Sequence, residues 1–191
     1  MKFKHTALLS LIATFICFGL VAVGTLIPKN QEQPEGRPTV LAATTFSGVY
    51  EPATRVKMSK CIAHGALPDF DCSPGAVFPT VTVKEICVAG YSSTVRNVPE
   101  SVKRQVFAEY GITTHMSGEY EVDHLISLEL GGSNDIANLW PEAAEPSPGF
   151  HQKDIVENFL HEQVCNGLLS LSEAQKVIAT DWLDIFHQMR D

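Results

Sequence analysis

The chain has 191 residues, of which 45% are hydrophobic and 19% charged, and its 22 acidic and 14 basic residues give a formal net charge of −8. This composition excludes a disordered or fibrous protein, and the length suits one ordinary domain with or without appendages. The acidic balance also excludes a general polyanion-binding surface, so any contact with nucleic acid must rest on a local cluster of lysine and arginine.

The N-terminus carries an apolar run over residues 7–27, preceded by Lys2 and Lys4. Such a run is typical of a signal peptide or a signal anchor, and it is long enough to cross a bilayer as a helix. The small residues at 22–24 favour cleavage. In either case we expect the remainder to be secreted, periplasmic or held on the outer side of the cytoplasmic membrane, because the positive charge stays inside. Contact with the membrane is expected only through an uncleaved segment.

Four cysteines lie beyond the apolar run, and none of them forms a Cys-x-x-Cys pair. In an oxidising compartment an even number of cysteines is typical of disulfides, for which three pairings are open. The alternative is a four-thiolate zinc site, which normally has closely spaced pairs. The cysteines concerned are Cys61, Cys72, Cys87 and Cys165.

Composition divides the chain after the apolar run into three parts. Residues 28–50 contain three prolines and no helical or strand periodicity, which predicts a flexible linker. Residues 51–90 are rich in Pro, Gly and Cys, which predicts a loop-rich lead-in with short strands at 81–83 and around 86–88. Residues 91–191 hold the longer periodic segments and are expected to form the main domain.

The main domain begins with a predicted helix that starts at Pro99 and ends at Gly111, because proline suits a first turn and glycine a helix C-terminus. Two further helices are predicted, one from about His151 and one from Ser170, which forms a capping box with Glu173. Each helix has an apolar stripe that indicates its buried face. The stripes are Val102, Val106, Phe107 and Tyr110 in the first helix, Ile155, Val156, Phe159, Leu160 and Val164 in the second, and Ala174, Val177, Ile178, Trp182 and Ile185 in the third.

The segment between the first and second helices has the pattern of two strands. Residues 121–130 alternate between two faces, which predicts a strand, and the glycine-rich turn at 131–135 ends it. A short second strand is predicted at 137–140, stopped by Pro141. The order strand, turn, strand, helix is a ββα arrangement.

Residues 121–141, with the sequence EVDHLISLELGGSNDIANLWP, closely resemble the HNH endonucleases, also called His-Me finger nucleases. The likeness is strongest over residues 119–157 and, with its flanks, covers most of residues 70–185. It implies an α+β fold in which a ββα-metal finger is flanked by helices and preceded by a disulfide-stapled lead-in. Many members bind a structural zinc through cysteine pairs near the finger. This chain has no such pairs, which favours disulfides as the staple.

The resemblance implies a metal-dependent endonuclease that hydrolyses phosphodiester bonds of DNA, or of RNA, and it assigns roles to four residues. Asp123 corresponds to the metal-binding acid and His124 to the general base. Asn138 corresponds to the middle asparagine of the motif, whose amide is expected mainly to pin the loop between the strands. His151 corresponds to the last motif position and to a second metal ligand, and the alternative is a residue that only caps or begins the helix. The expected cofactor is one divalent ion, Mg²⁺ first, with Mn²⁺ or another transition metal as the alternative.

The chemistry agrees with these residue types. Phosphodiester hydrolysis needs an activated water and positive charge on the phosphate oxygens. A histidine, with an unperturbed pKa of about 6.5, can take a proton from water near neutral pH. A regular strand sends Asp123 and His124 to opposite faces, so the strand must bend, or the metal must lie at its edge, for both to reach one phosphate. The alternative for His124 is a hydrogen-bonded core histidine.

Three basic residues are candidate substrate contacts, namely Lys153, Arg96 and Arg104. They are a weak signal in an acidic protein, and the alternative for Lys153 is an exposed position in the first turn of its helix. Asp154 and Glu157 are reserve metal ligands or partners of Arg96 and Lys103, and they lie one and two helical steps from the expected ligand on the same helix.

The remaining conspicuous side chains have ordinary structural explanations. Asn134 is expected only to suit the glycine turn, and the two tryptophans, Trp140 and Trp182, are expected in the core or at its rim. Four histidines show no ligand spacing and are expected to be solvated, namely His64, His115, His161 and His187.

The alternative function is an exported binding or structural module that keeps an HNH-like finger as a scaffold and catalyses nothing. The complete set of motif residues favours the enzyme. The net charge favours the scaffold. Removal of residues 1–27 takes away two lysines and no acidic residue, so the net charge of the exported part is −10 instead of −8.

Overall fold

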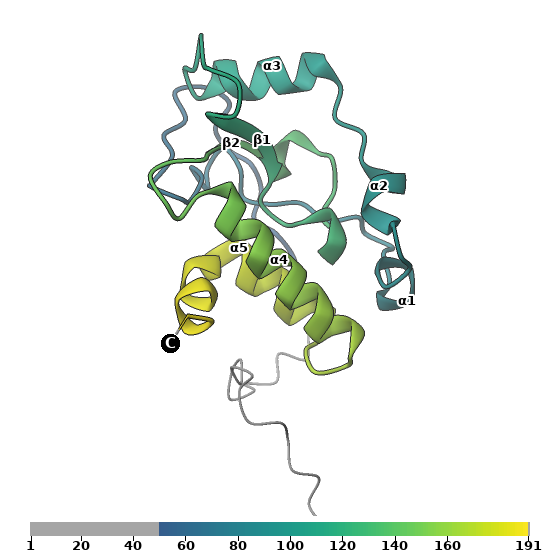
Figure 1. The fold of residues 1–191 in the computed structure, drawn as a ribbon. Coiled ribbons are helices and arrows are strands. Elements are labelled where there is room, and N and C mark those ends of the chain that lie inside the picture. The colour runs from purple at the N-terminus through teal and green to yellow at the C-terminus, as the bar shows by residue number, and fades with distance from the viewer. Residues whose placement is uncertain (1–49, 191) are drawn as a thin grey trace, which may run out of the picture. The chain divides into compact units, whose positions relative to one another are not determined.

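A computed structural model describes residues 50–190 (Figure 1). The apolar run over residues 7–27 and residues 28–49 of the expected linker lie outside this part of the chain. The described residues form an α+β fold, as predicted, with one two-stranded antiparallel sheet. The elements are α1 (Val83–Ile86), α2 (Tyr91–Val95), α3 (Glu100–Glu109), β1 (Tyr120–His124), the 3₁₀ helices η1 (Leu128–Leu130) and η2 (Ile136–Asn138), β2 (Leu139–Ala143), α4 (Phe150–Cys165) and α5 (Leu171–Gln188).

The sheet is shorter and differently placed than the alternation predicted. β1 pairs antiparallel with β2, with Asp123 opposite Trp140. The strand predicted over residues 121–130 is wrong beyond His124, because the next apolar residues are buried whichever way they point. Leu125, Ile126 and Leu130 are each 0% exposed, so their burial does not alternate between a core face and a solvent face.

Pro141 does not stop the second strand, as the sequence had suggested. β2 begins two residues later than predicted and runs through Pro141, which lies opposite Val122. A sheet of two strands consists only of edge strands, where the missing N–H of proline is tolerated.

The loop between the strands depends on its two glycines. Gly131 has a φ of 75°, in the left-handed region that favours glycine. A Cβ on Gly132 would lie 1.7 Å from the carbonyl oxygen of Ile126, so no larger residue fits there. This loop therefore folds back tightly behind the end of β1, and it carries Asn134 with it.

One short helix, α1, lies in the lead-in where strands were predicted, and a second, α2, lies at the start of the main domain where no element was predicted. The strands predicted at 81–83 and around 86–88 are wrong, because Thr82 caps α1 in a capping box with Glu85. α2 was not predicted; it follows Gly90, whose φ is 80°.

Three long helices enclose the sheet in layers. α3 lies over one side of the sheet, and α4 and α5 lie side by side on the other (Figure 1). The predicted helices at Pro99, His151 and Ser170 are confirmed, α4 beginning one residue early, at Phe150, and the Ser170 capping box is present. Trp182 and Trp140 are core residues, 0% and 1% exposed.

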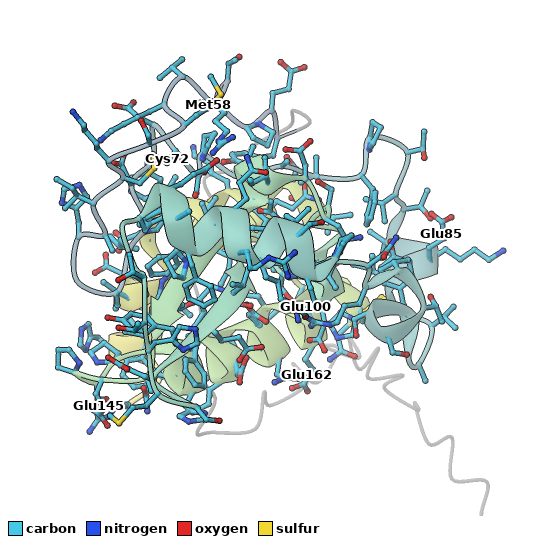
Figure 2. All side chains as sticks on the ribbon, turned by 90° about the horizontal axis from the view of Figure 1, so that it is seen from above. Met58, Cys72, Glu85, Glu100, Glu145 and Glu162 are labelled. Atoms are coloured by element: carbon cyan, nitrogen blue, oxygen red, sulfur yellow. A yellow bond between two sulfur atoms is a disulfide. The ribbon has the colours of Figure 1, made fainter. Side chains whose placement is uncertain are left out.

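Two disulfides join the lead-in to itself and to the main domain. Cys61 is bonded to Cys72, at the side of the molecule where Cys72 is labelled in Figure 2, and Cys87 after α1 is bonded to Cys165 at the end of α4. Disulfides are typical of an oxidising compartment. Within residues 50–190 no helix combines the length and the apolar character needed to cross a membrane.

We expect the disulfide between Cys87 and Cys165 to contribute more stability than the one between Cys61 and Cys72. The sequence separations are 78 and 11 residues, and loop-closure entropy then gives about 4.5 and about 2.8 kcal/mol. The measurement is urea unfolding of the two double Cys→Ala variants. A larger loss for the short loop would contradict the pairing or the entropic account.

Candidate active site

His124, the last residue of β1, is held in one orientation by Asn134. The residue is 2% exposed, and its Nε2 lies 3.1 Å from Oδ1 of Asn134. The Asn134 amide is itself fixed, because its Nδ2 donates to the carbonyl oxygen of Val95 (2.8 Å) and its Oδ1 accepts from the backbone N–H of Asn97 (3.1 Å). An amide oxygen has no hydrogen to donate, so Nε2 of His124 must be the donor.

This contact fixes the tautomer of His124. With the proton on Nε2, the lone pair lies on Nδ1, which is buried and has no hydrogen-bond partner among residues 50–190. Burial lowers the pKa of His124 below its ordinary value and outweighs the charge of Asp123 and the bond to Asn134, which both raise it. The ring is therefore neutral at pH 7, with Nδ1 as a proton acceptor.

Asp123 makes its main contact with Lys153 of α4, on the other side of the strand. The Lys153 ammonium donates to Oδ2 of Asp123 (2.7 Å), to the carbonyl oxygen of His124 (2.8 Å) and to Oε1 of Glu157. The Lys153 side chain is 0% exposed, and an ammonium has three donors. Lys153 is therefore not the exposed first-turn lysine considered above, and it has no donor left for a substrate phosphate.

The pKa values of the carboxylates around this ammonium are shifted in opposite directions. Burial raises the pKa of Asp123, but the charge and the hydrogen bond of Lys153, together with smaller effects of Glu142 and His124, hold that pKa below its ordinary value. Burial raises the pKa of Glu157 to about 7 and that of Glu142 well above its ordinary value. Burial would lower the pKa of Lys153, but the three carboxylates raise it well above the ordinary value. The pair of Asp123 and Lys153 is thus the one in this cluster whose pKa shifts both favour the charged forms.

Towards the surface, a second set of carboxylates gathers around Asp123. The pKa of Glu121 is raised by burial and by the charges of Asp123 and Asp154, and the pKa of Asp154 is raised by burial and by Asp123. The charge of His151, which is exposed in the first turn of α4, acts to lower the pKa of Asp154. Carboxylates that raise one another's pKa lie in surplus negative potential, which a divalent cation would relieve. Their oxygen atoms suit Mg²⁺ or Mn²⁺.

The closest groupings of possible metal ligands lie elsewhere. Within residues 50–190, groups of three or more ligand atoms within 4.8 Å of one another are found only at the two disulfides, one with Asp69 and one with His161. Disulfide sulfurs are not the thiolates that bind metals. The predicted ligands Asp123 and His151 belong to neither group, so a cation there would keep most of its positions for water and phosphate.

Asn138 acts on the loop and not on a substrate. It is 0% exposed, and its Oδ1 accepts from the backbone N–H of Ile126 (2.9 Å) and of Ala76 (3.3 Å). Its Nδ2 donates to the carbonyl oxygens of Ile126 and Ser133, both at 2.9 Å. The amide has no atom free for a ligand, which agrees with the expected role of pinning the loop.

The predicted basic contacts Arg96 and Arg104 line one groove together with Lys103. The groove has a volume of about 680 Å³ and lies between α3 and β1. Glu100, one of the residues that line it, is labelled in Figure 2. Arg96 lies close enough for its charge to act on His124 and on Glu121. The groove, which Glu100 and Glu121 also line, thus reaches Val122, the residue before Asp123 in β1.

Two contributors to the site, Asn134 and Glu142, were missed or misjudged in the sequence, and so was one residue outside the site, His161. Asn134 was expected only to shape a turn, but it sets the tautomer of His124. Glu142 was not considered, although it is buried beside Lys153, with Oε2 3.9 Å from the ammonium. His161 is not fully solvated, because its Nε2 lies 3.0 Å from the carbonyl oxygen of Ile86. The Ser-Asn-Asp run after two glycines was the only local signal for Asn134.

No protein-family model, no curated protein and no solved structure matches this chain.

Glu157 should make the stability of the protein depend on pH. Its pKa is raised from 4.5 to about 7, so between these values the folded protein holds a proton that the unfolded chain has released. The free energy of unfolding should therefore fall as the pH rises from about 4.5 to about 7, by on the order of 3 kcal/mol. In Glu157→Gln this part of the fall should be missing.

The measurement is urea unfolding at a series of pH values, with Glu51→Gln as the control at an exposed site. Equal pH dependence in Glu157→Gln and the unchanged protein would contradict the assignment.

Proposed function

We propose that this protein is a metal-dependent endonuclease of the HNH type, acting on DNA in preference to RNA. The observation that carries the proposal is the buried, neutral His124, whose Nδ1 has no hydrogen-bond partner among residues 50–190 and whose pKa responds to the charges of Asp123 and Arg96. Perturbed pKa values cluster at functional sites, and a buried polar atom without a partner needs an explanation, of which a catalytic role is one. The ββα order of β1, β2 and α4 supports the same assignment.

In the proposed reaction His124 is the general base. Its Nδ1 takes a proton from the attacking water, and the imidazolium that forms is stabilised by the carboxylate of Asp123 and by the bond from Nε2 to Asn134. The water oxygen forms a bond to phosphorus as the bond to the leaving oxygen breaks, and the leaving oxygen takes up a proton from solvent water. Because the ring is neutral before the reaction, this step needs no prior loss of a proton.

The positive charge for the phosphate comes from two sources in this proposal. A divalent cation bound by Asp123, with Asp154 and His151 at its border, would supply Lewis acidity to the phosphate oxygens. Arg96, at the entrance from the groove, would hold a flanking phosphate. Lys153 contributes indirectly, since its bonds to Asp123 and to the His124 carbonyl fix the end of β1.

The proposed location is outside the cytoplasm. The two disulfides fit an oxidising compartment. The apolar run behind Lys2 and Lys4 supplies the export signal or anchor in this proposal. Cells that export such an enzyme would meet nucleic acid released by other cells.

The second candidate is a non-catalytic binding module, and one observation favours it. His124 is 2% exposed and the ammonium of Lys153 already pairs with Asp123, so the two central residues of the motif are covered in this structure. A module that binds nucleic acid in the groove would need neither of them. The two candidates differ in whether the protein cleaves nucleic acid or only binds it.

His124→Ala should lower the rate of DNA cleavage by roughly 10²–10⁴, because it removes the base. The measurement is the nicking of plasmid DNA by the full chain with Mg²⁺, with Mn²⁺ and with a chelator. The exposed His187→Ala is the matched control and should retain full activity. Full activity in His124→Ala would contradict the mechanism, and the absence of cleavage by the unchanged protein with every metal would favour the binding module.

A further inference from the structure

The groove between α3 and β1 has one wall of aromatic rings. Phe107 and His115 are stacked, with ring centroids 4.4 Å apart and planes at 27°. Tyr120 approaches His115 edge-on, with centroids 6.2 Å apart. All three side chains line the groove, and His115 is exposed. These rings are thus stacked at a surface and not in the core.

The same groove has cations with free hydrogen-bonding capacity. Arg96 and Arg104 are exposed, and no carboxylate among residues 50–190 lies within 4.0 Å of either guanidinium. Lys103 pairs with Glu100 at 2.8 Å and so contributes less. Two guanidinium groups and three aromatic rings that line the same groove offer donors for anions together with planar apolar surfaces.

We infer that this groove binds single-stranded nucleic acid, with bases against the aromatic wall and phosphates at Arg96 and Arg104. Base faces are open in a single strand but covered by their neighbours in a duplex, and stacking of a base on an aromatic ring contributes about 1–3 kcal/mol. An acidic peptide would satisfy the arginines but would leave the rings without planar partners. The inference rests on the proposed function, because it names single-stranded nucleic acid as the preferred substrate of the proposed nuclease.

The position of the groove fits this substrate. Tyr120, Glu121 and Val122 line it, and the next two residues of β1 are Asp123 and His124. A strand held in the groove would therefore run past the proposed base. The negative charge of Glu121, together with only two unpaired arginines, limits the number of neutralised phosphates to about two. For a single strand this gives a log–log salt dependence of about −1.4, at roughly −0.7 per contact.

The test is fluorescence anisotropy with a labelled mixed-sequence oligonucleotide, offered as a single strand and as a duplex, to the full chain carrying His124→Ala so that the probe stays intact. We expect the single strand to bind more tightly than the duplex. Phe107→Leu, which keeps apolar volume but removes the ring, should weaken single-strand binding by about 5- to 150-fold. Phe70→Leu, at a ring that is 41% exposed outside the groove, is the matched control and should change nothing.

Three results would overturn the inference. They are equal or tighter binding of the duplex, single-strand binding that is unaffected by Phe107→Leu, and binding of a poly-glutamate peptide in preference to either nucleic acid. The inference and the proposed function fail separately. Cleavage of DNA without a preference for single strands would contradict the inference alone. Tight single-strand binding by an unchanged protein that cleaves nothing would contradict the proposed enzyme activity and support the binding role of the groove.

Discussion

The buried ammonium of Lys153 is the interaction on which the rest of the site depends. It joins α4 to the end of β1 through Asp123 and through the carbonyl oxygen of His124, and the side chain has no exposed surface. Leaving a buried charge without its partner typically costs 3–5 kcal/mol. Because Lys153 binds the backbone of one motif residue and the side chain of the other, the direction in which β1 ends is set by α4.

The end of β1 then allows Asp123 and His124 to have different partners. Asp123 faces α4, while the His124 ring turns towards the loop that carries Asn134. The alternation of a strand predicts that the two residues can share a site only if the strand bends or the metal lies at its edge. The two groups still influence each other's pKa, but their roles differ. The carboxylate of Asp123 is ionised and pairs with the ammonium of Lys153, and the imidazole of His124 is neutral.

Much of the fold follows from local patterns, whereas the site depends on contacts that no local pattern contains. The helices at Pro99, His151 and Ser170 and the presence of disulfides rest on spacing, capping and cysteine number, which act over short distances. The contacts of Lys153 with Asp123 and of His124 with Asn134 span 30 and 10 residues and require the tertiary fold. The sequence predicted His124 as a base from a resemblance, but not how its tautomer is set.

The central claim is that His124 is a neutral base with its proton on Nε2, and nitrogen-15 NMR of the imidazole rings tests it most directly. The ring nitrogens of His124, assigned by the loss of their signals in His124→Ala, should show a protonated Nε2 and an unprotonated Nδ1 at pH 7. Titration should give a pKa below the ordinary value of 6.5. A proton on Nδ1, or a ring that is charged at pH 7, would contradict the account.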